Sequence, residues 1–219
     1  MPADRRVSGA SRSWPGRVRT VPGGSLNNDT TFARLVSLAC HDLRTPLATV
    51  NGFARTLERT VELEAPADRY VEMIVAAVAQ LDELLDELSL VARIEADRYD
   101  PNLQEVDTLA LARAAADRLG EDRVKVEGEG APVLVDSAAV ERGVSALVQA
   151  ALRHGGLDEV QVRVRGAVLE VEPVTDSSSK VVLGQDLRDL GAAVAVRLLE
   201  RLGGAVEVDG SSLKIHLPQ

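Results

Sequence analysis

One histidine of the chain, His41, has neighbours that could make it chemically reactive. It lies in a stretch whose apolar side chains recur at intervals of three, four or seven, which predicts one buried stripe along a helix: Val36, Leu43, Leu47, Val50, Ala54, Leu57 and Val61. A step of about 100° per residue from Leu43 places His41 on the opposite side of that helix, where its imidazole meets solvent and partners. Asp42 can accept a hydrogen bond from one ring nitrogen, which leaves the lone pair of the other nitrogen free to act as a nucleophile. Thr45, one turn later, brings a hydroxyl group beside the same nitrogen.

The run from His41 to Leu47, His-Asp-Leu-Arg-Thr-Pro-Leu, resembles the H-box of bacterial sensor histidine kinases over seven consecutive positions. The resemblance implies that His41 is phosphorylated on a ring nitrogen and passes the phosphoryl group to an aspartate of a response regulator. It also implies that Asp42 assists transfer to the histidine and that Thr45 positions the water that dephosphorylates the regulator. A surface histidine on an ordinary amphipathic helix is the alternative, and the complete run disfavours it.

Composition and charge restrict the class of protein. The chain has 219 residues, a net charge of -9 and 2% aromatic residues, so two modest domains with cores of Leu, Val and Ala are expected. Its negative charge disfavours nucleic acid as a partner, because phosphate binding needs clustered cationic charge. With Cys40 as its one cysteine, the chain forms no internal disulfide. No signal peptide and no apolar run of about 18 residues is present, which predicts a cytoplasmic protein without a membrane span.

Residues 1–29 are predicted to form a disordered basic tail. Pro, Gly, Ser and Arg are frequent there, and apolar residues show no periodicity. The pair Arg5-Arg6 is not followed by the apolar segment that a twin-arginine export signal requires.

Residues 30–98 are predicted to form an antiparallel helical hairpin. The first helix is expected from about Thr31 to Leu63, Pro66 falls in the break, and the second helix begins at Ala67 or Asp68. The second helix carries a heptad seam: Tyr70, Ile74, Ala77, Leu81, Leu84, Leu88 and Val91. Because one hairpin buries only part of its apolar surface, we expect a homodimer that forms a four-helix bundle. Packing of the seam against the chain's own C-terminal half is the alternative. The family resemblance implies that this hairpin is the dimerisation and phosphoacceptor domain.

Residues 99–219 are predicted to form an α/β sandwich of one mixed sheet under three helices. We expect helices at 108–119, 138–154 and 187–202, and strands at 124–127, 133–135, 160–164, 167–171, 205–208 and 213–217. Residues 173–180 are expected to form a loop. The order of these elements resembles the ATP-binding domain of histidine kinases, so the overall class is α+β and the resemblance extends over about residues 31–219.

The resemblance fails at the nucleotide site. It places the asparagine that ligates the magnesium of ATP at Ala150, and a second asparagine at Ala146, but alanine has no oxygen to offer a metal. The glycine-rich box expected directly after the strand at 167–171 has no glycine in residues 172–179, although Glu172 or Asp176 could replace its acidic residue. Asp189 stands where a glycine would approach the phosphates and would repel them.

Two further histidines, His154 and His216, are predicted to have no catalytic role. They are far apart in the sequence and have no cysteine nearby, which makes a weak case for a metal site. No metal and no bound cofactor are therefore predicted.

These observations predict a dimeric phosphotransfer protein of two-component signalling, which acts in a phosphorelay without its own ATP-dependent kinase activity. His41 would exchange the phosphoryl group with receiver-domain aspartates of response regulators, and an upstream histidine kinase is a possible donor. The first alternative is an active cytoplasmic sensor histidine kinase that autophosphorylates His41 from ATP and magnesium, with substitutes such as Gln149. The second is a non-catalytic adaptor that binds a response regulator.

Overall fold

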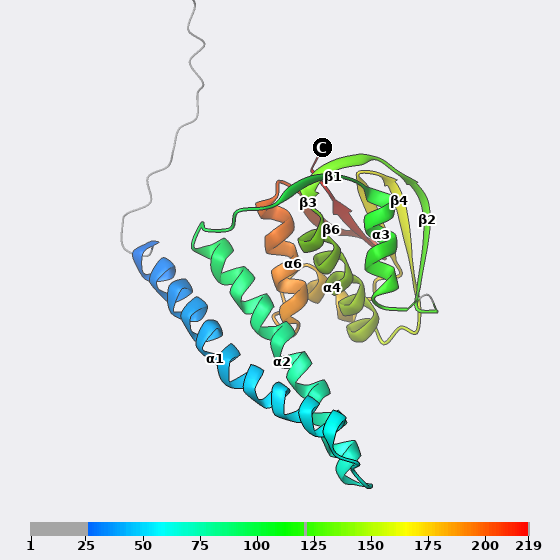
Figure 1. Cartoon of the computed structure of the whole chain (residues 1–219). Helices are drawn as coiled ribbons and strands as arrows, with labels where there is room; N and C mark the ends of the chain where they lie inside the picture. The colour runs from blue at the N-terminus through cyan, green and yellow to red at the C-terminus, as the bar shows by residue number, and fades with distance from the viewer. Residues whose placement is uncertain (1–25, 121, 219) are drawn as a thin grey trace, which may run out of the picture.

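The computed structural model describes residues 26–120 and 122–218, with side chains from residue 31 onward, and shows a long helical hairpin followed by an α/β sandwich (Figure 1). The predicted α+β class is confirmed. The hairpin consists of α1 (Leu26–Thr60) and α2 (Ala67–Glu95). Helix α1 begins before Thr31, its predicted start, and the rest of the predicted tail, residues 1–25, lies outside the described residues.

The two helices of the hairpin pack through side chains seven residues apart. The buried positions are Ala33, Cys40 and Ala54 on α1, with Leu47 half-buried between them, and Val71, Val78, Leu85 and Ala92 on α2. The two predicted apolar stripes are largely a different set. On α2, Tyr70, Ile74, Leu81 and Leu84 remain 39–59% exposed, and on α1, Leu43, Val50 and Leu57 remain 45–55% exposed. The buried side chains of α1 are the small ones, Ala33, Cys40 and Ala54, whereas its larger Leu43, Val50 and Leu57 lie on the outside of the hairpin.

The α/β sandwich contains a five-stranded mixed sheet and a separate two-stranded sheet. Among the described residues, the strands are β1 (Leu103–Asp107), β2 (Val124–Gly130), β3 (Pro132–Asp136), β4 (Val160–Gly166), β5 (Val168–Glu172), β6 (Ala205–Asp209) and β7 (Ser212–His216). The large sheet has the order β2-β4-β5-β7-β6, in which only β2 and β4 run parallel, and the small sheet pairs β1 with β3.

Four helices accompany the sheets in the described part of the chain: α3 (Thr108–Asp117), α4 (Ser137–Gly155), α5 (Asp176–Val182) and α6 (Leu190–Arg201). The apolar sides of these helices share one core with alternate residues of the large sheet. Predicted caps are confirmed, because the carboxylates of Asp107 and Asp136 accept hydrogen bonds from the first turns of α3 and α4. Gly156 caps the C-terminus of α4 with a left-handed φ of 63°.

Two features of the sandwich were predicted wrongly. Strand β1 was not expected, because its five residues include only Leu103 and Val106 as apolar side chains and its partner strand, β3, lies outside the large sheet. Residues 173–180 were expected to form a loop, but most of them form α5. Thr175 and Ser178 start this helix with a reciprocal capping box, a signal that a run of small polar residues conceals.

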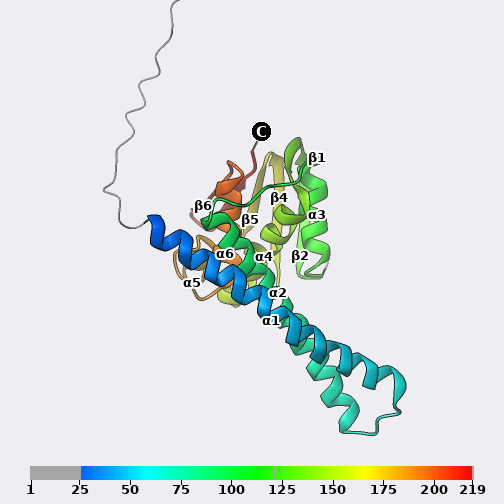
Figure 2. The same cartoon turned by 60° about the vertical axis from the view of Figure 1, so that its left-hand side comes forward.

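The sandwich packs on the C-terminal half of α2 through α6, as the two views in Figures 1 and 2 show. Tyr99, Ala139 and Leu198 are buried at this joint, and the Tyr99 hydroxyl donates a hydrogen bond to Asp136 at 2.9 Å. Ion pairs join Glu95 to Arg197 and Asp97 to Arg201 across it. Of the helices within residues 26–120 and 122–218, none is both long and apolar enough to cross a membrane.

Candidate functional site

His41 is exposed on α1, as predicted, although Leu43 and other members of the apolar stripe used for that prediction are about half exposed as well. Its side chain is 79% exposed and that of Asp42 is 69% exposed, and His41 Nδ1 lies 3.2 Å from Asp42 Oδ1. A carboxylate accepts a hydrogen bond, so this contact favours the tautomer that carries its proton on Nδ1. The lone pair of Nε2 is then available to an electrophile that approaches from solvent.

A shallow depression on α1 surrounds this imidazole. Its described lining is His41, Arg44, Thr45, Ala48 and Thr49. The structure thus brings Thr45 beside His41, as the one-turn spacing predicts, although Asp42 is not part of the lining. Helix α1 continues through Pro46, so these side chains are held on one rigid element.

Arg44 was overlooked at the level of sequence. Its Nη2 donates to Asp86 Oδ1 at 2.6 Å and so ties α1 to α2 beside the depression. The signal within the sequence is its place one turn after His41, but the partner lies 42 residues away and could not be identified before the fold was known.

A second cavity, of about 610 Å³, lies between the hairpin and the sandwich. Among the described residues that line it are Arg44, Glu83, Asp86 and Glu87 from the hairpin and Ala146, Gln149 and Gly191 from the sandwich. Glu87 reaches the first turn of α6, since one of its carboxylate oxygens lies 2.9 Å from where a Cβ on Gly191 would be. Burial, the negative charges of Asp189 and Glu83, and a weaker opposing effect of Arg153 together raise the pKa of Glu87 to about 7.

The residues at the predicted nucleotide site do not fit a magnesium–nucleotide group. Ala150 is fully buried in the core, and Ala146 is half-buried. Helix α5 occupies the segment where the glycine-rich box was sought and buries Ser178, Val181 and Val182 completely. These side chains pack into the core and leave no coordinating oxygen on the inner face of α4 at Ala150.

The acidic residues near that site are engaged elsewhere. Glu172 lies 3.8 Å from a guanidinium nitrogen of Arg163. Asp189 caps α6 through the backbone N–H of Ala192 and pairs with His154 at 3.0 Å and Arg153 at 3.4 Å. Gln149, the predicted substitute ligand, is exposed and faces the cavity between the hairpin and the sandwich.

The other two histidines bind carboxylates of the sandwich. The half-buried His154 contacts Asp189, and His216 Nε2 lies 3.1 Å from Glu207 on the neighbouring strand. Within the described part of the chain, no group of three or more His, Cys, Asp or Glu side chains is arranged to hold a metal ion.

Residues 33–97 match the His Kinase A (phospho-acceptor) domain family, and His41, Asp42 and Thr45 fall inside the match. The chain is 28% identical over 209 residues to the sensor protein DivL of Caulobacter vibrioides, an alignment that covers 82% of this chain and 27% of DivL. It is 26% identical over 140 residues to the sensor histidine kinase MtrB of Mycolicibacterium paratuberculosis, which covers 60% of this chain and 25% of MtrB. The chain therefore spans about a quarter of the length of these curated relatives.

The fold is also similar to that of a solved structure, full-length ShkA in complex with AMPPNP. The TM-score is 0.63 at 22% sequence identity, over 84% of this chain and 44% of ShkA. At 84% coverage the similarity extends over both the hairpin and the sandwich, and it supports the predicted order of a helical hairpin followed by an α/β sandwich.

Proposed function

The chain is a histidine-kinase-type protein of the bacterial sensor histidine kinase family, and from that premise we propose that His41 carries a phosphoryl group and exchanges it with the aspartate of a response-regulator receiver domain. One observation carries this proposal. The His41 imidazole is exposed on the hairpin, and Asp42 contacts its Nδ1, so that Nε2 faces outward as a nucleophile.

The chemistry follows from this geometry. Nε2 attacks the phosphorus of an aspartyl phosphate in line with the P–O bond to the carboxyl group. A P–N bond forms, the P–O bond breaks and the aspartate leaves as a carboxylate. The imidazole gains positive charge as it reacts, and the Asp42 carboxylate beside Nδ1–H stabilises that charge. The reverse reaction returns the phosphoryl group to the receiver, so alignment of the two partners is the main task of the protein.

The comparisons favour ATP as the source of the phosphoryl group. MtrB is named a sensor histidine kinase, and ShkA was solved with AMPPNP, so a kinase that autophosphorylates His41 is the alternative that the relatives support better than a phosphotransfer-only role. A specific observation favours the second candidate, transfer without ATP. The buried Ala150 and the packed α5 supply neither a magnesium ligand nor a glycine-rich turn.

Radioactive labelling separates these sources. The protein is incubated with ATP labelled on its γ-phosphate and magnesium, and separately with a panel of receiver domains phosphorylated by acetyl phosphate. Label that is acid-labile and base-stable, and that disappears in His41→Gln, supports the proposal. Label from ATP alone identifies a kinase, whereas label from a receiver alone identifies a phosphotransfer protein. If His41→Gln acquires as much label as the wild type, the proposal is wrong and a regulator-binding adaptor replaces it.

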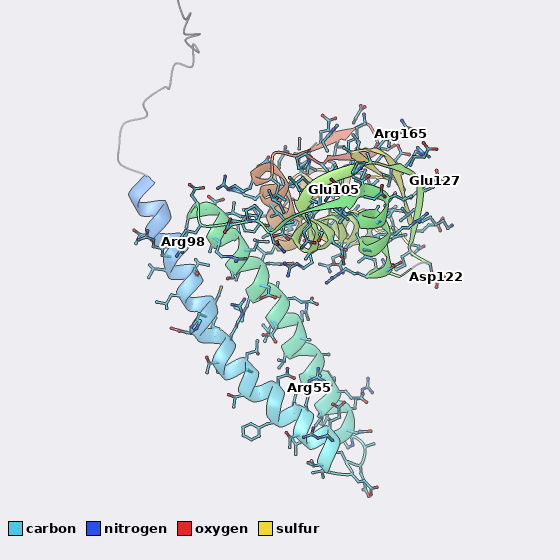
Figure 3. All side chains as sticks on the ribbon, turned by 45° about the horizontal axis from the view of Figure 1, so that its top comes forward. Arg55, Arg98, Glu105, Asp122, Glu127 and Arg165 are labelled. Atoms are coloured by element: carbon cyan, nitrogen blue, oxygen red, sulfur yellow. The ribbon has the colours of Figure 1, made fainter. Side chains whose placement is uncertain are left out.

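Assembly is part of the same proposal. We infer a cytoplasmic homodimer in which a second copy covers the outward apolar stripe of the hairpin. Support comes from that stripe, where Phe32, Leu43, Phe53, Tyr70 and Leu81 are each between 48% and 69% exposed. Figure 3 shows the end of the hairpin near Arg55 extending away from the sandwich, with its side chains projecting outward.

A further inference from the structure

Arg44 stands where it could contact a group attached to His41. Residues three apart on a helix lie on the same face, and His41 and Arg44 line the same depression. Of the five described residues that line it, only Arg44 carries a permanent positive charge. Its side chain is 39% exposed, so the guanidinium has room to turn.

We propose that Arg44 binds the phosphoryl group carried by His41 and releases Asp86 to do so. The inference rests on the proposed phosphorylation of His41 and adds a residue that the resemblance did not assign. In the unphosphorylated protein, Asp86 holds the guanidinium through one hydrogen bond of 2.6 Å and is itself 59% exposed.

The exchange of partners follows from charge and shape. A phosphoryl group carries a charge of about -1.5 to -2 near pH 7, against -1 for a carboxylate, so it attracts the guanidinium more strongly at equal distance. The planar guanidinium can donate two parallel hydrogen bonds to phosphate oxygens. The Arg44–Asp86 pair is exposed, and such pairs contribute little to stability, so its loss is a small penalty.

The arrangement of the residues around His41 also favours binding of the phosphoryl group by Arg44. The contact with Asp42 engages Nδ1 and directs phosphorylation to Nε2. Arg44 then neutralises part of the charge that His41 acquires, which makes the phosphorylated state longer-lived and easier to form. Asp86 does not bind the phosphate. It only pairs with the guanidinium of Arg44 while His41 is unphosphorylated.

The test uses phosphoramidate, which phosphorylates histidine without a kinase or a receiver. Its P–N bond breaks, a P–N bond to the imidazole forms, and ammonia leaves. Phosphorus NMR then follows the full-length protein, with His41→Gln identifying the resonance of phosphorylated His41 among those of His154 and His216. The readouts are the second pKa of the phosphoryl group and its hydrolysis rate.

A nearby cation lowers the pKa of the phosphoryl group, so the wild-type value should lie about half a unit or more below that of Arg44→Gln. The hydrolysis rate of Arg44→Gln should be several-fold higher. Arg44→Lys should fall between the two, because an ammonium is a point charge without the fork geometry. Asp86→Asn frees the guanidinium and should match the wild type or show a still lower pKa.

Asp86→Asn is also the matched control for a purely structural role. It breaks the same ion pair between α1 and α2 as Arg44→Gln does, and thermal unfolding reports the stability of both variants. If the two variants shift the phosphoryl pKa alike, or if Arg44→Gln leaves it at the wild-type value, Arg44 does not bind the phosphoryl group.

These measurements can distinguish a failure of this inference from a failure of the proposed function. If phosphoramidate labels His41 and Arg44→Gln shifts the pKa, but no receiver exchanges phosphate, the proposed function fails and this inference stands. If phosphoramidate leaves His41 unlabelled, the same measurements are made on protein labelled by a receiver or ATP. If no reagent phosphorylates His41, both are wrong.

Discussion

At the scale of single residues, the candidate site combines a contact between neighbours on one helix, His41 with Asp42, and a contact between two helices, Arg44 with Asp86. The position of His41 off the apolar stripe predicts its exposure, and the adjacent carboxylate predicts the contact of Asp42 with Nδ1, which lies at 3.2 Å. Arg44 contacts Asp86 of α2, and Glu87 lies against Gly191 of α6. These partners are far away in the chain, so nothing in the local sequence indicates them. Local spacing fixes neighbours within a helix, whereas contacts between elements depend on the fold.

Asp42 should control the rate of transfer to His41 without supporting the fold. Asp42→Asn keeps the size of the side chain but removes the negative charge that stabilises the reacting imidazole. We expect phosphoryl transfer to slow by about 100-fold, with an unchanged thermal unfolding temperature because the side chain is largely exposed. Rapid-quench measurement of labelled His41 checks the rate.

Thr45→Ala is the comparison variant for the same face. It should leave the rate of transfer to His41 within about threefold of wild type, a small change on the scale of catalytic effects, and should slow the dephosphorylation of the regulator instead. Equal effects of Asp42→Asn and Thr45→Ala on transfer would contradict these separate roles.

Glu87 should make the free energy of unfolding depend on pH in the range below neutrality. Its pKa is raised from 4.5 to about 7, by burial first and then by Asp189 and Glu83, with Arg153 opposing. Between these two values the folded protein binds more protons than the unfolded chain, so the free energy of unfolding falls as pH rises from about 4.5 to about 7 and this contribution is constant above.

Glu87→Gln removes the ionisation and should flatten that fall. The measurement is the urea midpoint at several pH values between 5 and 8, with Glu72→Gln as control because Glu72 is exposed on the same helix. His154 pairs with Asp189 beside Glu87, and both remain in each variant. A fall of equal steepness in Glu87→Gln and wild type would show that Glu87 is not the responsible group.

At the scale of elements, regular patterns were predicted well and short polar ones were not. Long periodic stretches gave both hairpin helices, α4 and the strands of the large sheet within a few residues. The apolar stripe chosen on α2 was the outward one, because α2 carries a second apolar stripe of Val71, Val78, Leu85 and Ala92, and sequence periodicity cannot tell which of the two faces the partner helix. The α5 segment was missed because Asp-Ser-Ser-Ser is typical of loops, and only the tertiary burial of Val181 and Val182 makes it a helix.

Packed α5 should behave as part of the core and not as a mobile lid. Its backbone N–H groups at Ser179 and Leu183 donate to carbonyls one turn earlier, and its apolar residues are fully buried. We expect slow amide hydrogen exchange across residues 178–183, similar to α4, while the connection at residues 61–65 exchanges quickly. Thr175→Ala removes the capping box, which costs about 1 kcal/mol, and should accelerate exchange in α5 about fivefold.

Amide hydrogen exchange also tests whether the protein binds ATP. If ATP with magnesium slows exchange in α5 and the first turn of α6 at micromolar concentration, nucleotide binds there and the kinase alternative gains direct support. Unchanged exchange would agree with the poor fit of Ala150 and α5 to a magnesium–nucleotide group.

At the scale of the whole molecule, the order of domains followed from sequence, but their joint did not. The hairpin and the sandwich meet through Tyr99 of the connection after α2, Ala139 of α4 and Leu198 of α6, which form one buried cluster only after folding. Ion pairs of Glu95, at the end of α2, and of Asp97, just after it, with Arg197 and Arg201 of α6 also cross the joint. The joint fixes the sandwich against one side of α2 and leaves the outward stripe of the hairpin uncovered.

That uncovered stripe should hold two copies of the chain together. Leu81 is 48% exposed on α2, on the predicted heptad seam, and a second hairpin would bury it in a four-helix bundle. Leu81→Glu would place an unpaired charge in that interface, which is strongly unfavourable. We therefore expect the wild type to be dimeric at micromolar concentration and Leu81→Glu to be monomeric, as measured by light scattering coupled to size-exclusion chromatography.

The control for this prediction is Leu187→Glu. Leu187 is 77% exposed in the connection between α5 and α6, away from the hairpin, so the same chemical change there should leave the dimer intact. Circular dichroism should show equal helix content in both variants, because neither side chain contributes to the buried heptads within the hairpin. A monomeric wild type, or a Leu81→Glu variant with the mass of the wild-type dimer, would mean that the stripe serves another partner. In that case His41 would act on a single hairpin, and a receiver domain or another protein would have to cover the apolar face.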